Sequence, residues 1–426
     1  MRNLKNIRRS VVRFPSSELP LTAVAWDSSR QDSVICSFGP TESSARVELK
    51  HVDPHAKPGA NHPSIASWDS PCPNPDLPCD QVLDLHYFAD TAVVCVVFAG
   101  GDIVLVREQP LPGEEPIEIA GSVDAGIAAA AWSPEEELLA ICTRANNFLL
   151  MSRDFDPVCD VPFSPEDTKL SKHVSVGWGK SETQFKGKRA KALRDPTMPE
   201  KVDEGSLSHL DQGEIRLSWR GDGAFVAVNS VEGGVRRMIR VFSRDGILDS
   251  VSEPVDYLEN ALSWRPAGNI IASVQRREGR IDVVFFERNG LRHGEFDLRL
   301  SKNEMQTRAS SVKLQWNIDS TVLAVVFKDC VQLWTMGNYH YYLKQEIPLD
   351  DQQWGPLDVK WHPENPLQLV VSGQGKPQTH IVITVSLANL QKAEIHCIDH
   401  ALSILKGPTF PPYDAGLVAV IDGRKW

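Results

Sequence analysis

The sequence of 426 residues contains no apolar run that approaches the roughly 20 residues needed for a membrane-spanning helix. Its basic N-terminus is not followed by the apolar core of a secretory signal peptide. The eight cysteines are scattered, which favours reduced thiols over a disulfide framework. We therefore expect a protein of the cytoplasm, with the nucleus as an additional compartment, and no membrane partner.

Positive charge is also in deficit. The 45 Lys and Arg residues are outnumbered by 56 Asp and Glu residues, which gives a formal net charge of −11. A chain of this charge offers no overall electrostatic attraction to nucleic acid. Any contact with nucleic acid therefore has to come from a local basic segment.

The sequence lacks a phosphate-binding loop, a dinucleotide fingerprint, a nucleophile elbow and a zinc-protease helix. Three groups of residues carry metal-binding side chains: 396–400, His51 with His55, and Cys72 with Cys79. Structural zinc sites usually combine two such groups, and the first has no second one near it in the sequence. We interpret all three as strand-edge or loop residues. We predict no catalytic residue, no metal and no cofactor.

The sequence does contain a repeated aromatic anchor. Each anchor ends a short run of small and apolar residues, and an apolar strand begins six positions later in most repeats. The anchors are Trp26, Phe88, Trp132, Trp219, Trp264, Trp316 and Trp361. Successive anchors are 62, 44, 87, 45, 52 and 45 residues apart. A period near 45 with several strands in each unit is typical of a β-propeller, in which bulky anchors pack one blade on the next.

One unit shows the arrangement within a blade. Strands are predicted to end at Trp264 and to cover 270–275, 280–287 and 294–300, with Asn289-Gly290 forming a tight hairpin. We therefore predict an all-β, seven-bladed, WD40-like propeller over residues 1–405. The leading segment 3–14 is expected to close the ring by pairing with the last blade.

The longer steps between anchors indicate two insertions, at about 53–80 and about 169–212. The first is rich in Pro, Ser and Asn and is expected to be a solvated loop. Residues 406–426 begin another apolar run, which we interpret as the start of a truncated second propeller.

The second insertion carries the strongest candidate contact site. Between Lys180 and Arg194 there are six basic residues and one acidic residue. Two aromatic side chains accompany them, and insertions on rigid scaffolds often carry function. The candidates are Trp178, Lys180, Phe185, Lys186, Lys188, Arg189, Lys191 and Arg194. They could bind nucleic acid through phosphates and stacked bases, bind an acidic protein, or simply keep the loop soluble.

The same segment resembles a known family. Residues 174–185, Val-Ser-Val-Gly-Trp-Gly-Lys-Ser-Glu-Thr-Gln-Phe, are similar to a signature of the largest subunit of the Elongator complex, the IKAP family. Further similar segments are 1–4, 215–225, 240–246, 262–273, 284–296 and 418–423. The resemblance runs the length of the chain, and the segments 53–80 and 186–204 depart from it.

The resemblance implies a non-catalytic scaffold in a complex that modifies carbon 5 of wobble uridines in tRNA. It implies other Elongator subunits as partners, including a catalytic radical and acetyltransferase subunit. Contact with tRNA would be made through the complex or directly, and dimerisation through a C-terminal region outside this chain. The alternatives are a WD40-type adaptor of another complex, an RNA-binding propeller, and a propeller enzyme with acidic or histidine side chains at one channel mouth.

Overall fold

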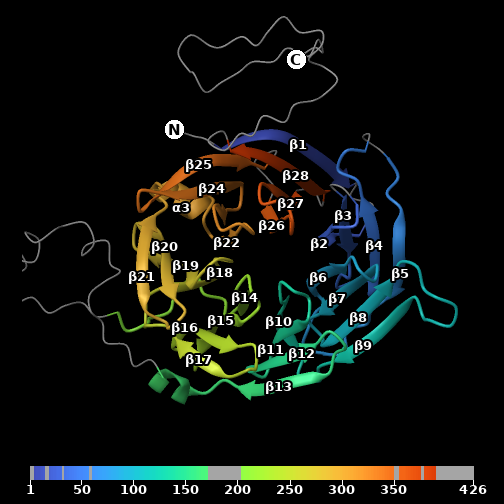
Figure 1. Cartoon of the computed structure of the whole chain (residues 1–426), viewed down its shortest axis with the longest axis horizontal. Coiled ribbons are helices and arrows are strands. Elements are labelled where there is room, and N and C mark those ends of the chain that lie inside the picture. The colour runs from blue at the N-terminus through green and yellow to red at the C-terminus, as the bar shows by residue number, and fades with distance from the viewer. Residues whose placement is uncertain are drawn as a thin grey trace, which may run out of the picture.

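Seven four-stranded antiparallel sheets are arranged in a ring in the computed structural model (Figure 1). The structure describes residues 4–14, 19–30, 33–56, 60–170, 203–349, 355–375 and 379–389. This arrangement confirms the predicted all-β, seven-bladed propeller. In the described part of the chain, no helix is long and apolar enough to cross a membrane.

Each blade is a meander of four strands, listed here from the centre of the ring outward. Blade 1 consists of β2 (Leu21–Asp27), β3 (Ser33–Phe38), β4 (Arg46–Val52) and β5 (Ser64–Asp69). Blade 2 consists of β6 (Val82–Phe88), β7 (Val93–Phe98), β8 (Asp102–Arg107) and β9 (Ile117–Ser122). Blade 3 consists of β10 (Ile127–Trp132), β11 (Leu138–Thr143), β12 (Asn147–Ser152) and β13 (Pro157–Pro162). Blade 4 consists of β14 (Arg216–Trp219), β15 (Phe225–Glu232), β16 (Arg236–Ser243) and β17 (Leu248–Val251). Blade 5 consists of β18 (Leu258–Trp264), β19 (Ile270–Arg277), β20 (Arg280–Glu287) and β21 (Arg292–Asp297). Blade 6 consists of β22 (Lys313–Trp316), β23 (Leu323–Val326), β24 (Cys330–Gly337) and β25 (His340–Pro348). Blade 7 consists of β26 (Gly355–Trp361), β27 (Gln368–Gly375), β28 (Thr379–Asn389) and β1 (Leu4–Phe14).

The ring is closed by the N-terminal strand. β1 pairs with β28 in antiparallel register from Leu4–Asn389 to Phe14–His380. The N-terminal strand thus supplies the outer strand of the last blade, as the sequence predicts. Closure of this kind removes free sheet edges between the first and last blades.

All seven predicted anchors lie at or next to the end of an innermost strand. Several indole nitrogens also join neighbouring blades. Trp219 Nε1 donates to Ala131 O at 2.9 Å, Trp361 Nε1 to Gln315 O at 3.1 Å, and Trp26 Nε1 to Lys360 O at 3.1 Å. In each case the acceptor directly precedes the anchor of the preceding blade. The indole therefore packs and also fixes the position of the neighbouring inner strand.

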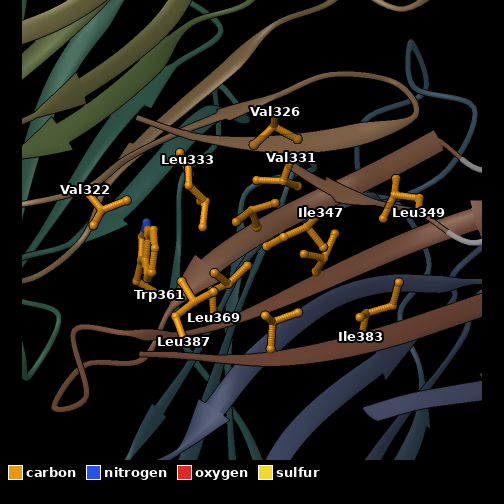
Figure 2. Packing of buried hydrophobic residues seen from close by; sticks show 14 of the residues in the cluster. Val322, Val326, Val331, Leu333, Ile347, Leu349, Trp361, Leu369, Ile383 and Leu387 are labelled. Carbon is orange, nitrogen blue, oxygen red and sulfur yellow. The ribbon is translucent and has the colours of Figure 1, made fainter. Parts of the chain in front are cut away.

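The hydrophobic core lies between blades rather than at the centre of the ring. Figure 2 shows this packing between blades 6 and 7, where Val331 and Leu333 lie across from Leu369 and Ile383. All four side chains are fully buried. Clusters of the same kind join the other neighbouring blades. The ring is consequently held by a series of similar interfaces.

The meander gives the ring two distinct faces. Turns between the first and second and between the third and fourth strands of a blade lie on one face, since successive strands run in opposite directions. We call this the exit face, because it includes the Leu4–Asn389 end of blade 7. The opposite face, here the insertion face, carries the turns between second and third strands and the connections between blades, including the described ends, 163–170 and 203–214, of the connection from blade 3 to blade 4.

Three parts of the structure differ from the sequence prediction. The expected loop 53–80 contains β5, whose Trp68 ring lies 6.4 Å from Phe98 in an edge-on contact. The fourth strand of blade 5 covers Arg292–Asp297 rather than 294–300. A short helix, α3 (Lys302–Thr307), begins at a Ser301–Glu304 capping box. The predicted start of a second propeller at 406–426 lies outside the described residues.

Candidate partner-binding surface

The residues predicted to contact a partner lie outside the described part of the chain. They are Trp178, Lys180, Phe185, Lys186, Lys188, Arg189, Lys191 and Arg194, all between residues 171 and 202. The structure does describe the two stems of this segment, which are residues 163–170 and 203–214. These stems determine where on the ring the insertion begins and ends.

The first stem is held by an ion pair to blade 4. It ends in a 3-10 turn, η1 (Pro165–Leu170). Asp167 accepts a hydrogen bond at 2.8 Å from Arg240 Nε, and the Arg240 side chain is completely buried. Arg240 also contacts Glu232, donates to Ser230 Oγ, and lies 4.5 Å over the ring of Phe163. A buried guanidinium with this many partners fixes the stem firmly to the blade.

The second stem begins on blade 5. Asp256 Oδ1 accepts hydrogen bonds from the backbone N–H groups of Glu204, Gly205 and Ser206 at 2.8 to 3.0 Å. Asp203 pairs with Arg292 of β21 at 3.3 Å. One carboxylate thus satisfies three successive backbone donors, an arrangement that fixes the local path of the chain.

The second stem then reaches blade 4 through a second buried arginine. Asp211 receives hydrogen bonds at 2.6 Å from both Nε and Nη2 of Arg237. The two side chains are 5% and 1% exposed. Burial raises the pKa of the Asp211 carboxyl, but the hydrogen bonds from Arg237 and the Gly213 N–H, with the guanidinium charge, lower it further, so the net shift is downward.

Both arginines belong to β16, and their spacing explains the arrangement. Side chains three positions apart on a strand point to opposite faces of the sheet. Arg240 therefore faces blade 3 and holds the first stem, whereas Arg237 faces blade 5 and holds the second. The two stems of the insertion therefore bind to opposite faces of blade 4. The acids that hold the stems were not predicted from the sequence; they are Asp167, Asp203, Asp211 and Asp256. The only signal for them in the sequence is the pair of arginines inside the apolar run of β16.

The weaker candidates from the sequence are placed as follows. His51 lies on strand β4 rather than in a loop, and its Nδ1 and Nε2 are 3.4 Å and 2.7 Å from Asp27 and Glu108. Cys72 and Cys79 are free thiols, and 396–400 lies outside the described residues. Among the residues that the structure describes, no group of three or more His, Cys, Asp or Glu side chains is placed to hold a metal ion.

A family model and several curated relatives are similar to this chain in sequence. Residues 1–364 match the family model of the ELP1 first N-terminal beta-propeller. Elongator complex protein 1 of Schizosaccharomyces pombe is 38% identical over 96% of this chain and 31% of its own length. The protein of the same name from Saccharomyces cerevisiae is 42% identical over 92% of this chain and 29% of its own length. This chain therefore spans about 30% of these relatives.

A solved structure supports the fold alone. A chain in a crystal structure of the mitotic checkpoint complex superposes with a TM-score of 0.53 at 11% identity, covering 90% of this chain and 91% of that chain. Identity this low carries no statement about function. The family model and the curated relatives, in contrast, show the family: the chain belongs to the Elongator complex protein 1 family and matches its first N-terminal β-propeller.

Proposed function

We propose that this propeller is a non-catalytic docking platform of the Elongator complex, which supports modification of carbon 5 of wobble uridines in tRNA. The observation that carries the proposal is the family match over residues 1–364, together with relatives named Elongator complex protein 1 at 38% and 42% identity. A closed ring of stacked blades suits such a role, because its surfaces are ordered before any partner binds.

The proposed partners are the other Elongator subunits, among them the catalytic radical and acetyltransferase subunit. Dimerisation is assigned to regions beyond this chain, and the cytoplasm, with the nucleus in addition, is the proposed location. The insertion face supports a contact near blades 4 and 5, since Arg240 and Arg237 fix both stems of the basic segment there. A long segment with fixed ends samples less space than a free tail, which lowers the entropy lost on binding.

Affinity purification of the tagged full-length protein tests membership of the complex. Recovery of the other Elongator subunits is the expected result. A different and reproducible set of partners would instead favour an adaptor in another complex.

The basic segment has its own test. A variant that replaces its six basic residues with Gln is compared with one that replaces six exposed Lys or Arg residues elsewhere on the ring. We expect loss of a subunit or of tRNA from the purified complex only with the first variant. Loss of tRNA binding with a shallower dependence on salt would assign the segment to RNA, because each phosphate contact contributes to that dependence. Unchanged subunits and tRNA would remove this segment from the proposal.

A further inference from the structure

The innermost strands of the seven blades surround the centre of the ring (Figure 1). Those of blades 4 to 7 line a cavity of about 210 Å³, here the channel cavity. Three residues before each aromatic anchor, these four blades contribute Arg216, Ala261, Lys313 and Asp358 to its wall. The equivalent residues of blades 1 to 3 are apolar: Ala23, Leu85 and Ala129. Charge at this position is therefore confined to blades 4, 6 and 7.

Lys360 is a cation of the channel cavity whose charge is compensated inside the ring. It belongs to blade 7 and reaches across blade 1 to blade 2, where its Nζ lies 3.3 Å from Asp84 Oδ1 and donates to Leu85 O at 3.0 Å. Burial lowers the pKa of Lys360, but the negative charges of Asp84 and Asp358 outweigh this effect, so the net shift is upward. Lys360 is thus a cation enclosed by carboxylates.

Lys313 of blade 6 lies in a different electrostatic environment. Burial lowers the pKa of Lys313, Asp358 opposes this effect, and the guanidinium of Arg216 adds to it. The net shift is downward, although Glu214 also opposes it. Glu214 pairs with Arg216 at 2.9 Å, and the two side chains are 47% and 43% exposed. Lys313 and Arg216 are therefore two cations that approach each other across blade 5.

The charges around the channel cavity alternate in sign except at one place. In order around the ring they are negative, positive, positive, negative, positive and negative, and they belong to Glu214, Arg216, Lys313, Asp358, Lys360 and Asp84. Blade 5 lies where the two positive charges approach each other, and it contributes Ala261 there. The acid of strand β18, Glu259, contacts Arg276 instead, and both side chains are largely buried. One negative charge between Arg216 and Lys313 would complete the alternation.

Two serine hydroxyls add hydrogen-bond donors to the same wall. Ser218 and Ser263 both line the channel cavity. Each Oγ accepts a hydrogen bond from the backbone N–H of the next anchor, Trp264 at 2.8 Å and Trp316 at 2.9 Å. A hydroxyl that accepts one hydrogen bond still has a proton to donate. The cavity wall thus combines two cations with hydroxyl donors, which suits an oxyanion.

The channel cavity is reached from the insertion face. A smaller hollow of about 60 Å³ shares Asn260 and Val312 with it. The wall of this hollow includes Leu210 of the second stem, which is 43% exposed. A ligand entering here would pass beside the stem that Arg237 holds through Asp211.

We propose that the channel cavity binds a small oxyanion, a phosphate or a carboxylate, between Arg216 of blade 4 and Lys313 of blade 6. Guanidinium and ammonium groups bind such anions through charge-assisted hydrogen bonds. A water molecule occupies roughly 30 Å³ in the liquid, so an anion of a few heavy atoms fits in the cavity together with water. The bound anion would join blades 4 and 6 across blade 5. This proposal does not depend on assembly of the Elongator complex.

Competitive chemical labelling of lysines in the full-length protein tests the proposal. An amine-reactive ester is applied at constant pH and ionic strength, with chloride replaced by inorganic phosphate or by acetate, and labelled peptides are quantified by mass spectrometry. We expect at least one anion to slow labelling of Lys313 about threefold or more, because an occupied site is protected in proportion to its occupancy. Lys328, exposed on the insertion face of the same blade, is expected to be unaffected. Stronger protection by phosphate would assign a phosphate ligand, and stronger protection by acetate a carboxylate.

A pair of arginine variants distinguishes a site from general screening of charge. Arg216→Met, at a side chain that is 43% exposed, is expected to abolish the protection of Lys313 by the anion. Arg236→Met, on strand β16 outside the channel cavity, is expected to retain it. Labelling of Lys313 that neither anion slows would overturn the proposal. So would equal protection of Lys328, or protection of Lys313 that persists in Arg216→Met.

Discussion

On the insertion face, buried arginines hold carboxylates that lie far away in the sequence, whereas on the exit face backbone and indole groups join neighbouring turns. Arg237 and Asp211 are 26 residues apart and almost fully buried. On the other face, Gly221 N donates to Pro266 O at 3.2 Å and Ala267 N to Ser320 Oγ at 2.7 Å. These exit-face contacts are neutral, although the same face also carries ion pairs, such as His51 with Asp27 and Glu108 and Arg244 with Glu135 and Glu137. The insertion face uses charge at single places to hold one long segment.

This difference has a consequence for how the two faces respond to mutation. A buried ion pair is costly to break, because the remaining charge is left without its partner. A neutral hydrogen bond repeated around a ring contributes less at each position. Substitutions on the insertion face should therefore have the larger effects, and each should act on a particular stem.

Removal of the Arg237 guanidinium is expected to have the largest effect. Arg237→Met leaves the Asp211 carboxylate, which is 5% exposed, without its bidentate partner. We expect a loss of about 3–5 kcal/mol in the free energy of unfolding, measured by denaturant titration. Arg244→Met is the matched control, since that side chain is 41% exposed and pairs with Glu135 and Glu137. It should cost less than about 1 kcal/mol. Equal losses of stability in Arg237→Met and Arg244→Met would contradict the claim that the buried ion pair matters more than the exposed one.

Asp256→Ala tests the second stem separately. It leaves three backbone N–H groups of residues 204–206 without their acceptor. We expect a loss of about 1–3 kcal/mol and faster amide hydrogen exchange at Gly205, read by mass spectrometry. Asp256→Asn retains the Oδ1 acceptor and should be milder. Unchanged exchange at Gly205 in the Ala variant would show that the carboxylate does not hold this stem.

Asp80, also on the insertion face, behaves in the opposite way, because no arginine of the described residues forms an ion pair with its carboxylate. It accepts a hydrogen bond from Gly100 N at 2.6 Å, yet burial raises its pKa to about 6. The folded state therefore binds this proton more tightly than the unfolded state, and the carboxylate destabilises the fold increasingly as pH rises from about 4 to 6. Asp80→Asn should stabilise the protein by on the order of 1–3 kcal/mol above pH 6 and have no such effect below pH 4. A pH-independent difference between the two proteins would contradict this.

The exit face is tested by Trp219→Phe, for which the smallest effect is expected. The substitution retains an aromatic ring and removes the indole hydrogen bond to Ala131 O. We expect a loss of about 1 kcal/mol, detected as a small decrease in the denaturation midpoint. A loss as large as that of Arg237→Met would mean that the two faces do not differ as described.

The repeat could be predicted from the sequence because it is local. Each anchor, its turn and the following strand are consecutive in the chain, as at Trp264, whose following strand is Ile270–Arg277. Closure by β1 was also predictable, since a ring of this kind needs an outer strand for its last blade. Strand β5 was missed because Ser64–Asp69 has few branched apolar residues and lies among prolines and polar residues.

The anchoring of the insertion could not be predicted in the same way. Arg240 and Asp167 are 73 residues apart, and no local pattern pairs them. The arginines inside β16 indicate buried partners without naming them. Helix α3 is an intermediate case, because Ser301 and Glu304 form a recognisable capping box. The predicted contact residues from Trp178 to Arg194 stay a prediction, since they lie outside the described residues.

Nucleoside mass spectrometry of total tRNA tests the central claim most directly. Cells that lack the gene are compared with cells that express it again from a plasmid. A propeller that serves Elongator predicts loss of the carboxymethyl-type groups at carbon 5 of wobble uridines, and their return with the plasmid. Unchanged levels of these nucleosides in the deleted cells would contradict the account and leave only the fold and the family relationship.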